Sequence, residues 1–418
     1  MSLKYKVFLH FIIITFIYCQ DNNGYWFNYF NDHSKIPALR DGIGIVLPER
    51  FNWFSYIERS DGALMIINSN WTTSFSYDGG KNWSEPTGMD APGREGYSIS
   101  SVIRLNDGSL GMFAVSENNE DTSKDNNFII NRLKWYISYN EGKTWESPVT
   151  INPTGELGLP YYDTVIQTRD GTIIIPVRRF NQGHSGLSKN SGAYGTIDGK
   201  RKKIEGHAHW PELDVSFVYL SENLGKTWKR SEGEIYIWKD DGYGGAWPMD
   251  EPNVVELKNG NLLMFGRTTL GRIYQSISVD GGIRWSIPTA TDLSSSYSPC
   301  RLRRIPISGD LICIWNQVSK KEIKKGFRRG RICSAISTDD GLTWKYLNTI
   351  STSGLDDVNY IKPSKPEFVR ANKELGLLSI EALNQIGYPN VGFIADQILI
   401  NYMDKLIILP YKWFYATH

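Results

Sequence analysis

The sequence has few cysteines, almost no net charge and no hydrophobic run long enough to cross a bilayer. Its 46 Lys and Arg residues balance 45 Asp and Glu residues, leaving a net charge of +1. This balance argues against general nucleic-acid binding through a strongly basic surface. No low-complexity linker interrupts the chain, which favours one domain.

The four cysteines do not form a disulfide scaffold. If Cys19 is lost with a leader, Cys300, Cys313 and Cys333 remain, an odd number without regular spacing. Buried free thiols are the expected state, and a Cys313–Cys333 bridge is the alternative.

The longest apolar run lies near the start, at residues 7–18, where only His10 and Thr15 are polar. Twelve residues are too few for a bilayer core, which needs about 20. With Lys4 and Lys6 before it, the run predicts a secretory signal peptide over residues 1–20, followed by one domain over residues 21–418. The protein is therefore expected to be secreted or periplasmic, and Cys19 offers lipoprotein anchoring as an alternative.

One short pattern, Ser-x-(Asp/Asn)-x-Gly-x-(Thr/Asn/Arg)-Trp, occurs five times. In it the Asp or Asn side chain can bond to turn N–H groups, Gly takes the left-handed backbone conformation, and Trp packs under the turn. This is the Asp-box of β-propeller blades, and we expect all five tryptophans to be buried or nearly so. The copies begin at Ser76, Ser138, Ser221, Ser278 and Ser337.

The spacing between successive box serines is 62, 83, 57 and 59 residues. A repeat of this length built from short strands indicates a propeller. A turn followed by an apolar run precedes each box, and a sixth such run at residues 396–400 has no box after it. The sequence therefore predicts an all-β, six-bladed β-propeller with Asp-box (BNR) repeats, its last blade closed by residues 40–58.

Two matched segments begin predicted inner strands, which line the central opening of a propeller. Glu251-Pro-Asn253 lies eight residues before Asn259, and Tyr388-Pro-Asn390 lies eight residues before Asp396. Equal offsets place the Glu and the Tyr at equivalent axial sites of blades four and six. Glu251 and Tyr388 are candidate catalytic residues, and both asparagines are candidate substrate contacts; the alternative is a strand start that tolerates proline.

Arginines recur at another fixed position. Arg272 and Arg331 each lie six residues before a box serine, and ten basic residues against two acids fall between positions 301 and 331. Arg329 competes with Arg331 for the same role. This locally positive blade predicts an anionic ligand.

The one long insertion, at about residues 180–213, explains the 83-residue spacing. Its end carries His207, His209 and Glu212, which are candidates for an acid or a substrate contact over the axial opening. The two histidines could also ligate a metal from a strand, but no third ligand is spaced convincingly, so we expect neither metal nor cofactor.

Together these residues resemble the sialidase (neuraminidase) superfamily, in its bacterial Asp-box branch. The resemblance implies six blades, three arginines on the substrate carboxylate, a Tyr nucleophile with a Glu base, and an Asp acid. It implies Tyr388 as nucleophile, Glu251 as base, and Arg272 with Arg331 or Arg329 as carboxylate ligands. The partner would be a glycan with a terminal anionic sugar.

Blade one departs from the family pattern. Asn52 stands where the family has the arginine of an Arg-Ile-Pro motif, so Arg50 is the nearest candidate, and residues 66–73 contain no Asp for the acid. Three alternatives remain open: a uronic acid as the sugar, a lyase or atypical glycosidase using His207 or His209, and a non-catalytic carbohydrate-binding propeller.

Overall fold

The computed structural model describes most of the chain from residue 34 onward. The described ranges are 34–40, 43–48, 54–116, 132–152, 159–180, 194–197, 200–203, 214–239, 245–268, 270–296, 298–317, 322, 329–355, 386–402 and 405–416. Cys19, Arg50, His207, His209 and Glu212 lie outside them.

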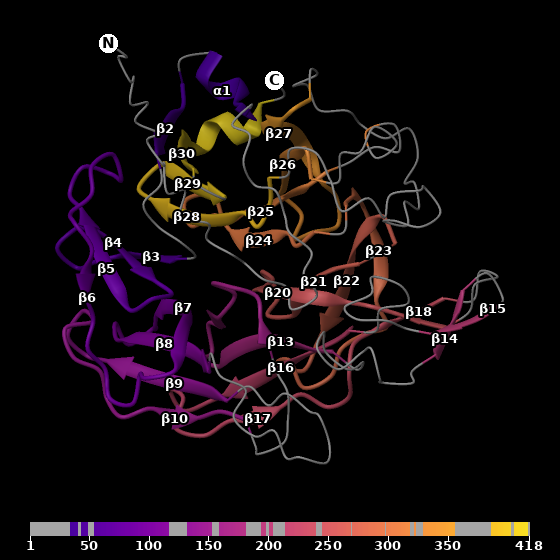
Figure 1. Cartoon of the computed structure of the whole chain (residues 1–418), viewed down its shortest axis with the longest axis horizontal. Coiled ribbons are helices and arrows are strands. Elements are labelled where there is room, and N and C mark those ends of the chain that lie inside the picture. The colour runs from indigo at the N-terminus through magenta and orange to yellow at the C-terminus, as the bar shows by residue number, and fades with distance from the viewer. Residues whose placement is uncertain are drawn as a thin grey trace, which may run out of the picture.

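Six antiparallel sheets stand around a central axis as the blades of a propeller (Figure 1). This confirms the predicted fold class. Blade one contains β3 (Phe54–Glu58), β4 (Leu64–Asn68), β5 (Thr72–Ser76) and β6 (Thr87–Gly88). Blade two contains β7 (Tyr97–Arg104), β8 (Leu110–Ser116), β9 (Leu133–Ser138) and β10 (Val149–Thr150). Blade three contains β11 (Leu159–Pro160), β12 (Ile166–Gln167), β13 (Ile173–Phe180), β16 (Asp214–Ser221) and β17 (Lys229–Arg230).

Blades four to six repeat the plan, and each starts with its inner strand. Blade four contains β20 (Asp250–Glu256), β21 (Leu262–Arg267), β22 (Arg272–Ser278) and β23 (Thr289–Ser294). Blade five contains β24 (Arg301–Arg304), β25 (Leu311–Asn316), β26 (Arg331–Ser337) and β27 (Lys345–Ser353). Blade six contains β28 (Asn390–Ile394), β29 (Gln397–Tyr402) and β30 (Lys405–Pro410).

The N-terminal segment forms strand pairs with both of the last two blades. Its strand β1 (Ser34–Lys35) pairs with β27 of blade five, and after the short helix α1 (Pro37–Arg40) its strand β2 (Ile45–Pro48) pairs with β30 as the outer strand of blade six. The expected closure of the last blade by residues 40–58 is confirmed. A 3-10 turn, Tyr411–Tyr415, follows β30.

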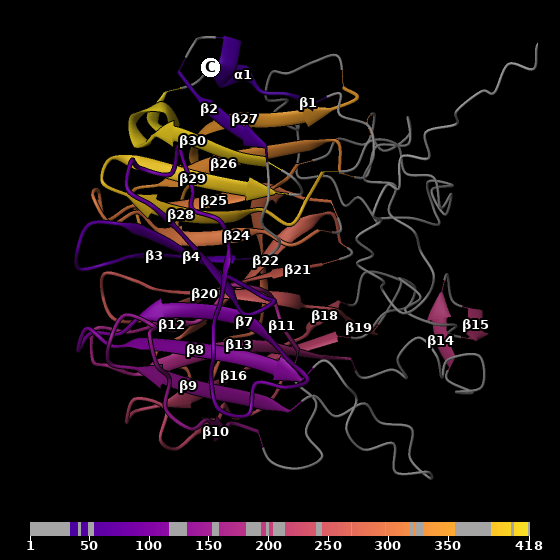
Figure 2. The ribbon, with the colours of Figure 1, turned by 60° about the vertical axis from the view of Figure 1, so that its left-hand side comes forward.

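Two ribbons lie outside the blades. They are β14 (Tyr194–Ile197) with β15 (Lys200–Lys203), which Figure 2 shows standing away from the sheets, and β18 (Ile237–Lys239) with β19 (Gly245–Trp247). The second ribbon leads directly into β20.

The hydrophobic core consists of layers between neighbouring blades. Met65 of blade one and Met112 of blade two share one cluster, and Val218 of blade three and Met264 of blade four share another. Each side chain is at most 2% exposed, so each layer removes apolar surface from water on two blades at once.

The Asp-boxes form the turns that the sequence predicts. In the first, Asp78 accepts bonds from the N–H groups of Lys81 and Asn82, and Ser76 accepts from Gly80, whose φ is +89°. Of the five tryptophans, Trp145 is buried, at 5% exposed, and the other four are partly buried and pack against the hydrophobic clusters.

One box glycine is required by a neighbouring blade. A Cβ at Gly225 would lie 2.1 Å from the indole of Trp135 in blade two, and the indole N–H donates to the adjacent Leu224 carbonyl. Close approach of the backbone to the ring therefore demands glycine here.

The three described cysteines are free and buried. Burial raises the pKa of the Cys333 thiol to about 12, as expected for an inert thiol. Among the described residues, no helix is long and apolar enough to cross a membrane.

Candidate active site

Glu251 and Tyr388 meet at the axis through one arginine. The Nη1 atom of Arg267 lies 2.7 Å from the Glu251 carboxylate and 3.5 Å from the Tyr388 hydroxyl. Arg267 ends β21 and pairs with Asp250 of β20, whereas Tyr388 comes from blade six. A single guanidinium nitrogen thus connects the two candidate catalytic groups.

The backbone at both positions is strained in the same way. Glu251 and Tyr388 have φ values of +43° and +56°, which are unfavourable for residues with a Cβ and more so before a proline. At Glu251 the register of β20 also shifts between Asp250 and Asn253. Such bulges and left-handed residues re-aim side chains and concentrate at functional sites.

Arginines and carboxylates are paired within this cluster. Arg178, which reaches in from β13, lies 2.5 Å from Asp250 and 3.6 Å from Glu251. At the other end, the Arg329 guanidinium lies 4.9 Å from the centre of the Tyr388 ring. Carboxylates therefore surround Arg178, while Arg267 and Arg329 present positive charge to Tyr388.

These charges control the ionisation of Glu251, which is 4% exposed. Burial raises its pKa, but the positive charges of Arg267, Arg178 and Arg329 outweigh burial and hold the pKa below its usual range. Glu251 is consequently a carboxylate at neutral pH and can accept a proton.

Arg301, the first residue of the inner strand β24, is 1% exposed. Its guanidinium donates to the carbonyls of Tyr162, Asp163 and Pro389 and lies 4.5 Å from the centre of the Tyr161 ring. Arg301 thereby joins blade five to blade three and to the residue after Tyr388.

Tyr161 supports the same segment. Its hydroxyl donates to the Pro389 carbonyl over 3.1 Å, and its ring centre lies 6.0 Å from that of Tyr388. Gly387 packs closely as well, because a Cβ there would lie 3.2 Å from Arg329 and from Asn316. Tyr388 is thus fixed from several sides.

Two other arginines from the sequence prediction make bonds within their own blades. Arg272, at the start of β22, donates to the Thr291 carbonyl in the outer strand β23. Arg331, at the start of β26, bonds Thr349 and Glu322 and is 1% exposed. Of the competing pair, Arg329 is the residue that the structure brings to Tyr388.

Both asparagines are buried beside the axis and make internal bonds. Asn253 donates to the Glu251 carbonyl and accepts from Arg301 over 3.4 Å, and Asn390 accepts from the Val391 N–H group. They hold the strand starts on which Glu251 and Tyr388 stand.

Sequence reasoning missed Arg267, Arg178 and Tyr161. Arg267 could have been found from its distance to the Asn259-Gly260 turn, since hairpin pairing sets it opposite Asp250. Arg178 and Tyr161 had no such signal, because both act across blade boundaries. Within the described ranges no group of three or more His, Cys, Asp and Glu side chains could hold a metal ion.

A family model described as the BNR repeat-like domain matches residues 133–396, more than half of the chain. The chain belongs to this family. No curated protein matches the sequence.

Several solved structures share this BNR repeat-like fold at 14% sequence identity. A protein of unknown function from Dyadobacter fermentans has a TM-score of 0.56 and covers 91% of this chain and 100% of its own. An intramolecular trans-sialidase from Ruminococcus gnavus has a TM-score of 0.52, and the match covers 88% of this chain and 97% of that one. The NanB sialidase from Streptococcus pneumoniae has a TM-score of 0.51, and the match covers 87% of this chain and 69% of that one. Bacterial sialidases are therefore among its structural neighbours, a likeness of fold.

Proposed function

We propose that this protein is a retaining exo-glycosidase of sialidase type, which removes a terminal anionic sugar from a glycan. The observation that carries the proposal is the bond of one Arg267 nitrogen to both Glu251 and Tyr388. The shared fold of bacterial sialidases supports the same reading.

Each residue has a defined task in this reaction. Glu251 takes the proton of the Tyr388 hydroxyl while the Tyr388 oxygen forms a bond to the anomeric carbon of the sugar. The bond from that carbon to the glycosidic oxygen breaks, and the leaving oxygen receives a proton from an acid. Water then gives a proton to the conjugate base of that acid and attacks the anomeric carbon. Tyr388 leaves and recovers its proton from Glu251, and the sugar is released with its configuration retained.

A tyrosine suits an anionic sugar for an electrostatic reason. A carboxylate nucleophile would meet repulsion from a carboxylate on the substrate, whereas a phenol is neutral until its proton is taken. Arg267 and Arg329, which both contact Tyr388, are proposed to bind the substrate carboxylate and to stabilise charge developing on the phenolic oxygen. His207, His209 and Glu212 remain the candidates for the acid.

The test is hydrolysis of 4-methylumbelliferyl glycosides of sialic acid and of uronic acids, which also decides the sugar. Tyr388→Phe should lower kcat at least a thousandfold, because the nucleophile is lost. The matched control is Tyr139→Phe on an exposed box turn, which should leave the rate unchanged.

Three outcomes would overturn the proposal. Full activity in Tyr388→Phe would exclude the tyrosine nucleophile, and formation of an unsaturated sugar would indicate a lyase. Binding of the glycan without any turnover would indicate a carbohydrate-binding propeller.

A further inference from the structure

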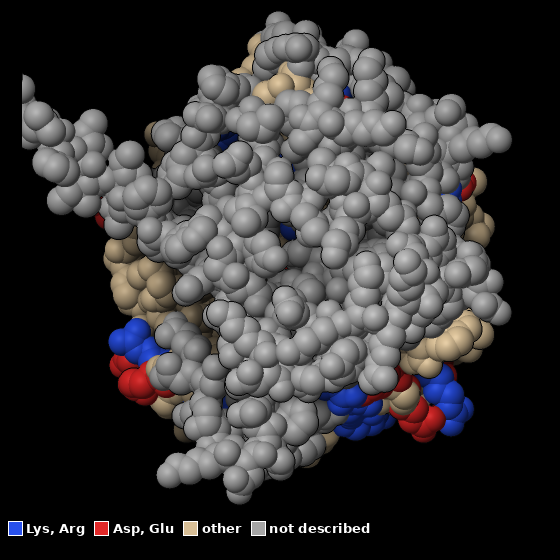
Figure 3. Space-filling model, turned by 45° about the vertical axis from the view of Figure 1, so that its right-hand side comes forward, with Lys and Arg blue, Asp and Glu red and all other residues tan. Residues whose placement is uncertain are grey.

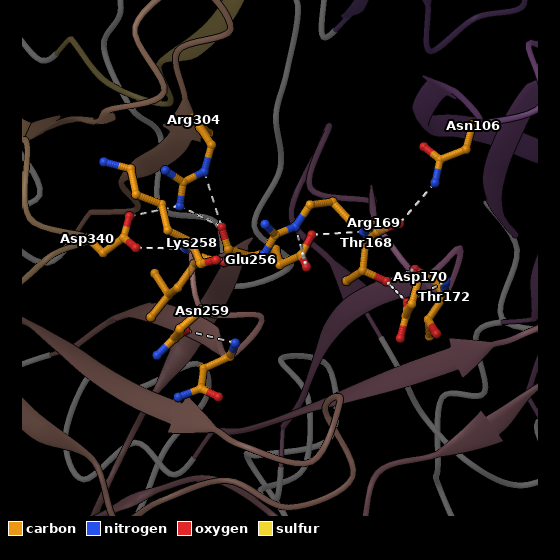
Figure 4. Close-up of polar contacts among 12 residues, drawn as sticks. Asn106, Thr168, Arg169, Asp170, Thr172, Glu256, Lys258, Asn259, Arg304 and Asp340 are labelled. Atoms are coloured by element: carbon orange, nitrogen blue, oxygen red, sulfur yellow. Dashed lines mark hydrogen bonds and ion pairs between the residues drawn. The ribbon is translucent and has the colours of Figure 1, made fainter.

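A cavity of about 320 Å³ opens at the far end of the inner strands from Glu251. We call it the rear cavity; its walls are the strand ends and turns of blades three to five, around Arg169, Lys258 and Arg304 (Figure 4). Glu256, on its wall, is five residues after Glu251 in β20, or about 17 Å along an extended strand. The rear cavity is therefore separate from the candidate active site.

Four cationic side chains line the rear cavity, against one acidic residue, Glu256. They are Arg169, Lys258, Arg303 and Arg304. Ion pairs hold the guanidinium groups in place: Arg169 with Glu256 at 3.0 Å and Arg304 with Asp340 at 3.0 Å. The positive groups are thus positioned in advance, which reduces the entropy lost on binding.

Two of the cations have capacity for a further anion. Within the described ranges, no carboxylate or carbonyl bonds the exposed Lys258 ammonium group. Arg303 meets Asp163 at 2.9 Å, yet burial and, to a smaller extent, the nearby charge of Arg301 lower its pKa to about 10. A second anion near Arg303 would offset that cost of burial.

Part of the remaining wall is apolar. Ile166, Val255 and Leu257 line it, and an inorganic ion alone would make no use of this apolar surface. Small-molecule sites commonly combine such apolar walls with a few fixed polar groups, and their volumes start at about 300 Å³.

We propose that the rear cavity is a second binding site, for a compact organic carboxylate of the size of a monosaccharide acid. The carboxylate binds between the cationic side chains, where guanidinium forks match its geometry, and the body of the ligand packs on the apolar wall. This site is independent of the proposed hydrolysis.

Isothermal titration calorimetry with D-glucuronate tests the proposal, with D-glucose as the neutral control and sulfate as the inorganic one. Glucuronate should bind and glucose should not, and sulfate should bind more weakly because it leaves the apolar wall uncovered. Lys258→Met should weaken glucuronate binding about tenfold, the usual effect of losing a charged hydrogen bond. Lys226→Met, an exposed lysine of the third Asp-box, is the matched control.

Arg267→Met separates the rear cavity from the candidate active site. Glucuronate binding that persists in this variant and weakens in Lys258→Met supports the rear site. Binding that is lost in Arg267→Met and unchanged in Lys258→Met would overturn it, as would the absence of any glucuronate binding. Circular dichroism confirms that each variant is folded, and Arg169→Met, at an exposed side chain, provides a second variant at the same site.

Discussion

Replacement of Arg301 by Met should destabilise the whole propeller, because this buried side chain bonds groups of two other blades. Met keeps most of the length and removes the guanidinium, so the carbonyls of Tyr162 and Asp163 lose their donor. A buried acceptor left without a partner costs about 1–3 kcal/mol, and loss of the stacking on Tyr161 costs about 1 kcal/mol more.

Relief from burying a charge offsets part of this loss. The net cost should be about 4 kcal/mol, a large share of the 5–15 kcal/mol that usually stabilises a folded protein. For a propeller of this size the unfolding entropy converts 4 kcal/mol into a fall in Tm of about 5 °C.

Scanning calorimetry and urea unfolding measure this change. The matched control is Arg59→Met, because Arg59 also has an ion pair, with Asp61 at 3.0 Å, and an aromatic ring, Phe75 at 5.1 Å, but lies on the periphery. It should cost about 1 kcal/mol or less. If Arg301→Met melts within about 1 °C of the wild type, the axial role of Arg301 is refuted.

Three further predictions concern packing, ionisation and the acid. Gly225→Ala should lower the free energy of unfolding, measured in urea, by at least about 2 kcal/mol more than Gly260→Ala does. Both glycines have positive φ, but only a Cβ at Gly225 would meet a neighbouring ring. Equal losses of stability in the two variants would contradict this packing. In the pH profile of kcat/KM, the fall on the acidic side should occur below the usual glutamate pKa, since Glu251 is held ionised. Arg178→Met should move this fall to higher pH, because removal of a positive charge raises the pKa of Glu251. An unchanged profile would show that Arg178 does not influence the ionisation of Glu251. His207→Ala should lower kcat about a hundredfold on a glycan with a poor leaving group and little on a 4-methylumbelliferyl glycoside, whereas equal effects on both would exclude an acid role.

The ring of blades could be predicted because its signals are local. Each Asp-box contains its own turn chemistry, as in the Ser76 to Gly80 bonds, so five copies report five blades without knowledge of distant contacts. The matched placement of Glu251 and Tyr388 could be predicted for a related reason, since equal offsets from equivalent turns give equivalent positions.

The arginines show where this reasoning stops. Arg272 and Arg331 share an offset, but that offset marks the start of a third strand rather than the axis. Arg267 reaches Tyr388 from the end of a second strand, across a hairpin whose register shifts at Asp250. Arg178 reaches Asp250 from another blade, and no local pattern encodes a contact between blades.

Charge on the visible surface agrees with the balanced composition. At the rim of the face in Figure 3, Lys and Arg lie beside Asp and Glu, and no single sign dominates there. Among the cavity-lining residues that the structure describes, four cations face one acid, an arrangement that suits a small anion.

The pairing of β2 with β30 has a consequence for how the ring forms during synthesis. A ribosome makes β2 long before β30, so the edge of β2 stays open until blade six exists. An open edge accepts any compatible strand, including β30 of a second copy. At high protein concentration, refolding should therefore divide between closed monomers and strand-exchanged dimers, whereas dilution should favour the monomer.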